Sequence, residues 1–241
     1  MMERTKKLIA MNKEWQSFWH DKWEQGDIGF HKDEYHPALV NHGPGAIAHA
    51  AQRLHGTQQL RALFPLCGKS LDMKWLYNYF RQENIPATVV GVELSETAIA
   101  SFKKEHCSFM DHSKSKSLAL QLHVADFFKS SELFPTASEH FNFIFDRAAL
   151  VALPSELRIP YVEQCRNIMR PGGVILLVTF DYGENTTLGP PFSIPKQQVE
   201  SLYHFAQSIQ HLERRVMPAT SKKFTDEMIT DIYEDDYLII L

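Results

Sequence analysis

Residues 61–80 change from an apolar run to a helical spacing of apolar positions. Arg61 to Leu66 is a short apolar run, and Pro65 to Lys69 interrupts it. After Ser70 the apolar residues follow the spacing of one helix face: Leu71, Trp75, Leu76, Tyr79 and Phe80. The pattern therefore predicts a strand, a loop and a helix. At such a junction, backbone N–H groups at the start of the helix point toward a ligand.

Further predicted strands end on polar residues. The strands are expected at 88–92, 118–125, 141–145, 173–180 and 237–241. The first four are followed by Glu93, Asp126, Asp146 with Arg147, and Asp181. Because ligands bind at the carboxyl edge of an open α/β sheet, these side chains predict a nucleoside site there. An acidic residue after the second strand, here Glu93, is placed to accept hydrogen bonds from ribose hydroxyls.

Helical patterns alternate with these strands and predict a mostly parallel sheet with helices on both faces. The expected helices are 12–25, 45–55, one capped by Ser95, 155–169 and 196–206. Pro171 to Gly173 is expected to close the fourth of these helices. The polar stretch 107–117 is expected to form a surface loop, and the first eleven residues a frayed arm, with a weak transit signal as the alternative.

Three tryptophans, Trp15, Trp19 and Trp23, recur at every fourth position of the helix predicted over 12–25. Such a stripe holds too much apolar surface to stay in water, so we expect this helix to dock on the rest of the protein. Periodicity alone favours permanent packing on the sheet over a lid that closes on a ligand.

The composition is that of one globular domain of 241 residues, with 44% hydrophobic residues and a net charge of −4. This charge gives no electrostatic footprint for nucleic acid or anionic lipid. Three scattered cysteines favour a reduced, cytoplasmic location, and no apolar run is long enough for a membrane span. We expect a monomer, because no heptad pattern or long exposed apolar helix is present. We also expect no metal site, because His42, His49 and His55 have no ligand partners at metal spacing.

The loop after the first strand, PLCGKS, narrows the choice of nucleoside. It has one glycine and matches neither the dinucleotide fingerprint nor the phosphate loop, both of which need several close backbone approaches to phosphates. A nucleoside without phosphates remains, and S-adenosylmethionine is the common one. Glu93 would then bind the ribose, Asp126 would lie near the adenine amino group, and Leu66 to Gly68 would pass the methionine moiety.

Five segments together resemble the thiopurine S-methyltransferase family. They are WHDKWEQGDIGFH (19–31), FPLCGKSLDMKWL (64–76), VVGVELSE (89–96), FDRAALVAL (145–153) and GPPFSIP (189–195). Their order and spacing agree from about residue 15 to the end of the chain. The resemblance implies a Rossmann-like class I methyltransferase sandwich with a seven-stranded sheet. It also implies one domain over residues 1–241, in which residues 1–35 cover the cofactor site.

The resemblance also implies the site residues. Cofactor contacts are expected from Trp19, Phe30, Leu66, Gly68, Glu93, Ala125, Asp126 and Arg147. Substrate contacts are expected from Phe30, Arg147, Pro190, Pro191 and Phe192. The helix over 12–25 is now expected to cover the cofactor partly, with Trp19 turned to the site. One departure concerns the acceptor end: Ala148 stands where the family commonly has glycine after the arginine.

The implied reaction is methyl transfer from S-adenosylmethionine to the sulfur of a small aromatic or heterocyclic thiol, leaving S-adenosylhomocysteine. No general base is required if the acceptor arrives as a thiolate, and Arg147 would hold an anionic acceptor or the cofactor carboxylate. An ion pair of Arg147 with Asp146, or with a neighbouring carboxylate, that only closes the strand end is the purely structural alternative. Three rival functions stay open: methylation of inorganic sulfur, selenium, tellurium or halide anions; adenosyl binding without catalysis; and a nicotinamide-dependent oxidoreductase.

Overall fold

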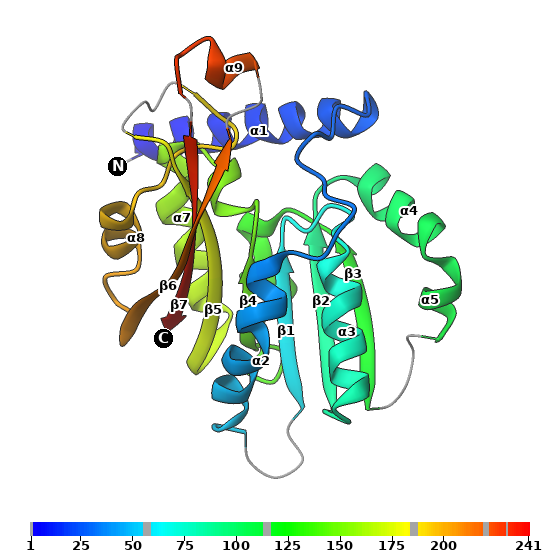
Figure 1. Ribbon diagram of the computed structural model, residues 1–241. Helices are drawn as coiled ribbons and strands as arrows, with labels where there is room; N and C mark the ends of the chain where they lie inside the picture. The colour runs from blue at the N-terminus through cyan, green and yellow to red at the C-terminus, as the bar shows by residue number, and fades with distance from the viewer. Residues whose placement is uncertain (1, 55–58, 113–116, 184–187, 219–221, 230) are drawn as a thin grey trace.

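A seven-stranded sheet with helices on both faces forms the centre of the computed structural model (Figure 1). The structure describes residues 2–54, 59–112, 117–183, 188–218, 222–229 and 231–241. The strand order is β3-β2-β1-β4-β5-β7-β6. β1 to β5 run parallel, whereas β7 is antiparallel to both of its neighbours. The predicted fold class is therefore confirmed, with a mixed sheet.

The described elements alternate along the chain. The strands are β1 Leu60–Pro65, β2 Ala87–Glu93, β3 Leu118–Val124, β4 Phe141–Asp146, β5 Met169–Asp181, β6 Ser208–Pro218 and β7 Asp231–Ile240. The α-helices are α1 Met2–Glu24, α2 Pro37–Ala51, α3 Asp72–Gln82, α4 Glu96–Glu105, α5 Cys107–His112, α6 Ser130–Leu133, α7 Ser155–Asn167, α8 Lys196–Leu202 and α9 Lys222–Thr225. Two short 3₁₀ turns are η1 Phe127–Lys129 and η2 Leu150–Ala152.

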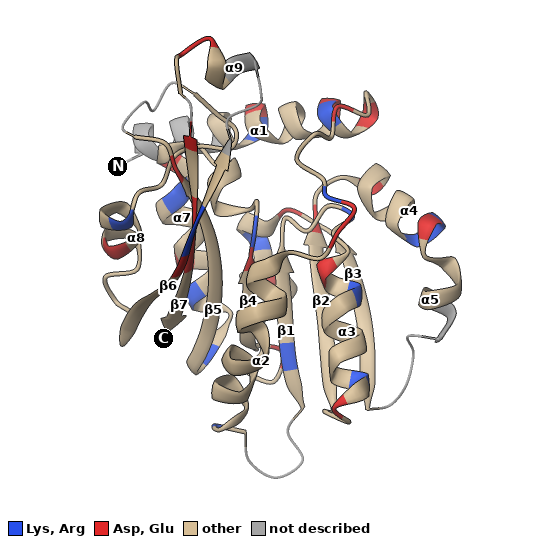
Figure 2. Ribbon diagram, in the orientation of Figure 1, with Lys and Arg blue, Asp and Glu red and all other residues tan. Residues whose placement is uncertain are grey.

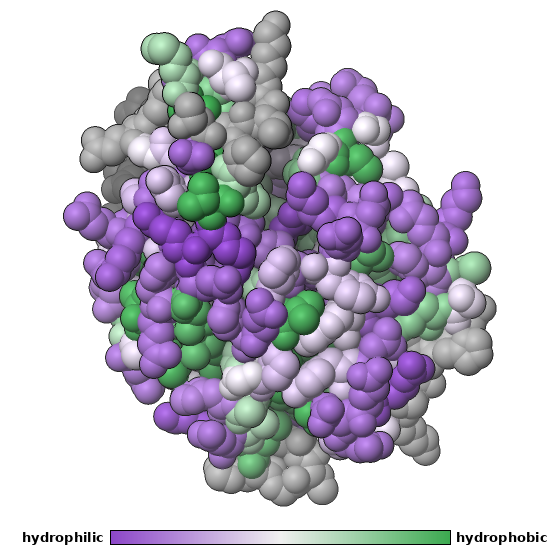
Figure 3. All heavy atoms as spheres, in the orientation of Figure 1, coloured by the Kyte–Doolittle hydropathy of each residue, from purple (hydrophilic) through white to green (hydrophobic). Residues whose placement is uncertain are grey.

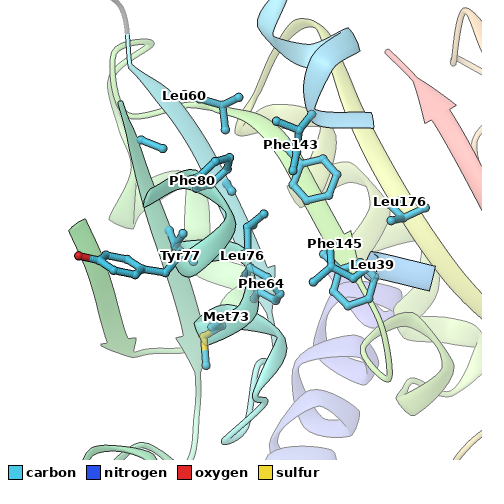
Figure 4. Packing of buried hydrophobic residues seen from close by; sticks show 14 of the residues in the cluster. Leu39, Leu60, Phe64, Met73, Leu76, Tyr77, Phe80, Phe143, Phe145 and Leu176 are labelled. Carbon is cyan, nitrogen blue, oxygen red and sulfur yellow. The ribbon is translucent and has the colours of Figure 1, made fainter. Parts of the chain in front are cut away.

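Two apolar cores fill the spaces on either side of the sheet. One lies beneath α2, α3 and α4, where Leu39, Leu76 and Phe143 are fully buried (Figure 4). The other lies beneath α7 and α8 and includes Tyr161 and Tyr203. Burial of this much apolar surface on both faces is what holds parallel strands in a sheet.

Several predicted boundaries are wrong because tertiary packing overrides local signals. α2 begins at Pro37 and continues through Gly43 to Gly45, since its apolar residues Leu39 and Ile47 are buried against the sheet. α1 begins at Met2, so the frayed arm is wrong; its first half is rich in good helix formers. Residues 107–112 form α5 instead of a loop, and 113–116 lie outside the described residues.

Two further differences concern strands. β5 begins at Met169, and Pro171 to Gly173 lie inside it at an irregular register with β4. They therefore do not close α7, which ends at Asn167. β6 was not predicted at all, because its sequence SIQHLERRVMP lacks an apolar alternation.

β6 and β7 are joined by paired charges, visible as neighbouring basic and acidic segments in Figure 2. Arg215 binds both oxygens of Asp236 at 2.6 Å and also reaches Glu234 at 2.8 Å. Arg214 binds both oxygens of Asp235 at 2.8 and 2.7 Å. Because Asp235 and Asp236 are fully buried, these bidentate pairs offset the desolvation of the two carboxylates and join the edge strand β6 to β7.

His42 packs against this network, which corrects the expectation that it has no carboxylate partners. Its Nε2 lies 3.1 Å from Glu213 and 3.7 Å from Asp236, and the three ligand-type atoms lie within 4.8 Å of one another. Arg215 Nη1 already lies 2.9 Å from Glu213 and 2.6 Å from Asp236. We therefore interpret the cluster as an ion-pair network. His49 is half-buried in α2, and His55 lies outside the described residues.

The face of the molecule in Figure 3 is mainly hydrophilic, and its hydrophobic residues form small separate groups. None of the helices within the described ranges combines the length and the apolar content needed to cross a bilayer.

Gly91 gives a direct test of the packing at the centre of β2. A Cβ at Gly91 would lie 2.7 Å from Met73 Sδ, 2.8 Å from Cys67 Sγ and 2.9 Å from Leu122. We expect Gly91→Ala to lower the free energy of unfolding by about 1–3 kcal/mol through overpacking. Gly45→Ala, where no atom lies within 4 Å, should instead raise it by about 0.5–1 kcal/mol, because alanine favours a helix. Urea unfolding measures both, and equal effects would contradict the packing described.

Candidate active site

One cavity of about 1010 Å³ lies at the carboxyl edge of the parallel strands, beneath α1. Most of the residues expected to bind cofactor or substrate line it: Trp19, Phe30, Leu66, Gly68, Glu93, Ala125, Asp126, Arg147, Pro190 and Pro191. They come from seven separate places along the chain, and the fold brings them together.

Phe192 is the expected site residue that is not among the described residues lining this cavity. Its ring centroid lies 5.9 Å from that of Trp15 and 5.5 Å from the Arg158 guanidinium. Its backbone N–H donates to the Val151 carbonyl at 2.7 Å. The Phe192 side chain therefore packs behind Gly189 to Pro191, on the side away from the cavity, and supports these three residues.

Glu93 organises the loop after β1. Its Oε2 accepts a hydrogen bond from the Gly68 N–H at 2.8 Å, and its Oε1 accepts one from the Ser95 N–H at 2.8 Å. Leu66 and Gly68 have φ angles of +46° and +52°, so the loop turns back sharply twice within three residues. The carboxylate thus ties the end of β1 to the start of α4.

Glu93 also keeps acceptor capacity toward the cavity. Each carboxylate oxygen can accept about two hydrogen bonds. Oε2 accepts one from Gly68 in the loop, and Oε1 accepts one from Ser95 at the start of α4. Burial raises the pKa of the Glu93 carboxyl, while the N–H groups of Ser95, Gly68 and Leu94 oppose that shift. A buried carboxylate that lines a cavity and has free lone pairs fits the two hydroxyls of a ribose.

Gly68 has a second role that only the structure reveals. A Cβ at Gly68 would lie 2.8 Å from the indole ring of Trp23 in α1. Trp23 is buried, and its ring packs edge-on against Phe30 at 5.4 Å between centroids. The single glycine of the loop therefore also makes room for the N-terminal helix.

Two hydrogen bonds hold α1 across the cavity. Trp15 Nε1 donates to the Ala152 carbonyl at 2.9 Å, and Gln16 Nε2 donates to Asp126 Oδ2 at 2.9 Å. Asp126 Oδ1 accepts from the Phe128 N–H at 2.9 Å and caps η1. Gln16 lines the cavity and was not predicted. Gln16 follows Trp15 and lies about one helical turn before Trp19. That position could have indicated that it faces the cavity together with Trp19.

Trp19 and Phe30 form an aromatic corner of the cavity. Their rings meet edge-to-face with centroids 5.2 Å apart, and Phe18 packs against Trp19 at the same distance. Both Trp19 and Phe30 line the cavity, and the faces of aromatic rings are electron-rich.

Arg147 is a half-buried cation that lines the cavity. Within the described residues no carboxylate oxygen lies within 4.0 Å of its guanidinium, and its Nη1 donates to the Phe30 carbonyl at 3.4 Å. Burial lowers the pKa of Arg147, and the more distant Asp72 and Glu234 raise it. The expected alternative, an ion pair with Asp146, is therefore absent, and most guanidinium donors stay available to a ligand.

Asp146 and Asp181 do not line the cavity in the described structure, although both end strands at its edge. Asp146 is buried and accepts hydrogen bonds from the Leu150 N–H and the Tyr161 hydroxyl. Asp181 pairs with Arg214 at 3.0 Å. Of the four acidic residues that follow strands, Glu93 and Asp126 face the cavity, and the other two support the structure.

The far end of the cavity is apolar. Its walls come from Phe180, Gly189, Pro190, Pro191, Val216, Met217, Phe224 and Ile232. Tyr182 fastens this wall, because its hydroxyl donates to the Leu188 and Pro191 carbonyls at 2.8 and 2.9 Å. Its ring packs on Phe224 with centroids 5.1 Å apart. The sequence did not indicate the contributions of β6 and α9, because neither element was predicted.

Cys67 lines the cavity, and its surroundings favour the neutral thiol. Burial and then the nearby Glu93 carboxylate raise the pKa of the Cys67 thiol well above its ordinary value. A neutral thiol is a poor nucleophile. Its sulfur packs close to Gly91, in agreement with a small residue that lets the loop turn tightly.

The fold is one that solved S-adenosylmethionine-dependent methyltransferases share. The structure of a Burkholderia thailandensis 1,6-didemethyltoxoflavin-N1-methyltransferase, solved with S-adenosylhomocysteine, shares this fold. It gives a TM-score of 0.56 over 97% of this chain and 89% of that chain, at 14% identity.

The chain belongs to the thiopurine S-methyltransferase family, whose pattern matches residues 14–239. A thiopurine S-methyltransferase of Aliivibrio salmonicida is 38% identical over 201 residues, covering 83% of this chain and 87% of the relative. One of Vibrio atlanticus is 32% identical over 229 residues, covering 92% and 96%. The resemblance inferred from the five sequence segments is confirmed.

Ala148 lines the cavity in a left-handed backbone conformation, with φ of +60°. This conformation costs an alanine roughly 1–2 kcal/mol, and glycine adopts it freely. Allowing for the greater freedom of unfolded glycine, we expect Ala148→Gly to raise the free energy of unfolding by about 0.5–1 kcal/mol. Ala100 is an exposed residue inside α4, and Ala100→Gly should lower the free energy of unfolding by about 1 kcal/mol. If urea unfolding shows both variants destabilised alike, Ala148 is not strained.

Asp146 predicts a specific dependence of stability on pH. Burial raises its pKa from 3.8 to about 6, so between these values the native state binds a proton that the unfolded state does not. The protonation of Asp146 therefore adds to the free energy of unfolding at low pH, and this stabilisation is lost as the pH rises through about 6. The difference between the two pKa values corresponds to about 3 kcal/mol.

Asp146→Asn keeps an acceptor for the Leu150 N–H and cannot ionise. We expect the stability of the variant relative to the natural protein to increase by up to about 3 kcal/mol between pH 4 and pH 7. Urea unfolding of both proteins at several pH values measures this difference, in which the other titrating groups cancel. Parallel pH profiles would show that Asp146 is not protonated in this range.

Proposed function

We propose that the protein transfers the methyl group of S-adenosylmethionine to the sulfur of a small aromatic or heterocyclic thiol. The observation that carries this proposal is the apolar far end of the 1010 Å³ cavity, which has Arg147, next to the end of β4, at its inner side. A planar aromatic thiol fits between such walls, and its thiolate charge suits a guanidinium without a carboxylate partner. Relatives that bear the name thiopurine S-methyltransferase support the same class of acceptor.

The proposed cofactor placement follows the cavity from end to end. Glu93 holds the ribose hydroxyls, Asp126 and Ala125 lie beside the adenine, and the loop from Leu66 to Gly68 passes the methionine moiety. Trp19 and Phe30 then lie near the sulfonium. Residues 1–35, which include α1, cover the cofactor in this arrangement, and the two hydrogen bonds of Trp15 and Gln16 support it.

When bound, S-adenosylmethionine supplies a methyl group on a positively charged sulfur. The thiolate sulfur of the acceptor bonds to the methyl carbon in line with the bond that breaks, and S-adenosylhomocysteine leaves. The protein contributes position, charge and exclusion of water. The rings of Trp19 and Phe30 stabilise an adjacent cation by roughly 0.5–2 kcal/mol. Arg147 favours the ionised form of the acceptor and orients it. No proton has to be removed in the site if the acceptor enters as the thiolate, which heterocyclic thiols form readily.

The decisive experiment combines binding and transfer in one preparation. The protein is titrated by calorimetry with S-adenosylhomocysteine and, separately, with NADH. Labelled S-adenosylmethionine is then offered with 6-mercaptopurine, iodide or selenite as the acceptor. We expect binding of S-adenosylhomocysteine alone and label on the thiopurine.

Each other outcome contradicts a stated part of the proposal. Label on iodide or selenite but not on the thiopurine would assign the acceptor to the inorganic anions. Binding of S-adenosylhomocysteine without transfer to any acceptor would indicate an adenosyl-binding module without catalysis. Binding of NADH would overturn the choice of cofactor that rests on the one-glycine loop.

A further inference from the structure

The carboxylate of Asp126 is occupied by the protein itself. Oδ1 accepts from the Phe128 N–H, and Oδ2 accepts from Gln16 Nε2, each at 2.9 Å. Gln16 comes from α1, 110 positions earlier in the chain. Any group recognised at Asp126 Oδ2 therefore also meets the carboxamide of Gln16, because both residues line the same cavity.

The contact with Asp126 fixes which way the Gln16 amide points. A carboxylate only accepts hydrogen bonds, so the NH₂ group of Gln16 must face Asp126 and the carbonyl oxygen must face away. Within the described residues, Gln16 Oε1 has no hydrogen-bond partner, and one Nε2 hydrogen is also unused. An acceptor and a donor are thus held side by side in a fixed order.

This order matches the edge of adenine. The exocyclic amine of adenine donates, and the neighbouring ring nitrogen accepts, which is the pattern that a glutamine amide reads with two hydrogen bonds. Hypoxanthine carries a carbonyl oxygen in place of the amine, so it would put an acceptor against Gln16 Oε1. The amide cannot rotate to suit it without turning its own oxygen toward Asp126.

We propose that Gln16 is a further cofactor-binding residue that reads the adenine amino group, and that Asp126 sets the orientation of its amide. The proposal rests on the proposed placement of adenine beside Asp126. It makes α1 part of the recognition site, in addition to its being a cover over the cavity. The 6-amino base is then selected by two elements that are distant in sequence.

A purely structural role for Gln16 makes a different prediction. If the bond to Asp126 only docks α1, its loss weakens every ligand by the same factor. The bond from Trp15 Nε1 to the Ala152 carbonyl provides the matched control, because it also docks α1 but is made to a different element, η2. Trp15→Phe removes that N–H and keeps an aromatic ring.

The test compares S-adenosylhomocysteine with S-inosylhomocysteine. The two differ at the 6-position of the base, which carries an amine or a carbonyl, and in the hydrogen that hypoxanthine has on the adjacent N1. Calorimetry gives the affinity of both ligands for the natural protein, Gln16→Met and Trp15→Phe. We expect the natural protein to prefer the adenosyl ligand. Gln16→Met should weaken S-adenosylhomocysteine roughly 5–20-fold and leave S-inosylhomocysteine nearly unchanged, as expected for lost hydrogen bonds. Trp15→Phe should weaken both ligands equally.

An equal loss of both ligands in Gln16→Met, or no loss of either, would overturn the proposal. Thermal unfolding of each variant shows whether it is folded at the titration temperature, and Gln16→Asn serves as a second variant if Gln16→Met is not. A failure of the proposed function is distinguishable. If the cofactor is wrong, the natural protein binds neither homocysteine ligand. If only the acceptor or the catalysis is wrong, the failure is seen in the transfer assay and these affinities do not change.

Discussion

The hydrogen bonds from Gly68 and Ser95 to the Glu93 carboxylate are the interaction on which the rest of the site depends. They hold the turn after β1 in a conformation with two left-handed residues and start α4 at a fixed distance from it. Because the turn is closed in this way, Gly68 leaves space for Trp23, and α1 packs down over the strand ends. One buried carboxylate therefore fixes both the loop after β1 and the packing of α1 over the cavity. The hydrogen bonds from its N–H partners offset the cost of removing the carboxylate from water.

The cavity has two chemically different ends because two parts of the fold build it. The end formed by β1, β2 and β3 presents carboxylates and backbone groups, which suit a nucleoside. The end formed by β5, β6, β7 and α9 presents apolar side chains, fastened by the Tyr182 hydroxyl. Arg147 stands at the junction without a close carboxylate, so its charge acts on whatever is bound there. In the proposed function, this division separates cofactor recognition from acceptor recognition.

Much of the fold and of the cofactor end was predictable because the signals are local. The helix cap at Ser95, the buried face of α4 and the polar residues after β2 and β3 all lie within a few positions of what they determine. The pairing of β6 with β7 was not predictable. Arg214 and Arg215 resemble solvent-exposed residues until Asp235 and Asp236 face them across the ladder. Gln16 was missed because its partner is also distant in sequence: the orientation of its amide is set by the hydrogen bond to Asp126.

The sequence by itself determined the alternation of strands and helices, the family, the cofactor and many of the residues that line the cavity. These follow from periodicity, capping and short motifs, which act over one turn or one strand. Only the tertiary structure decided which strand-end acids face the cavity, that Phe192 lies behind its loop, and that Arg147 lacks a close carboxylate. The physical reason is that burial and charge pairing depend on groups far apart in sequence, and the strength of both is set when the chain closes around them.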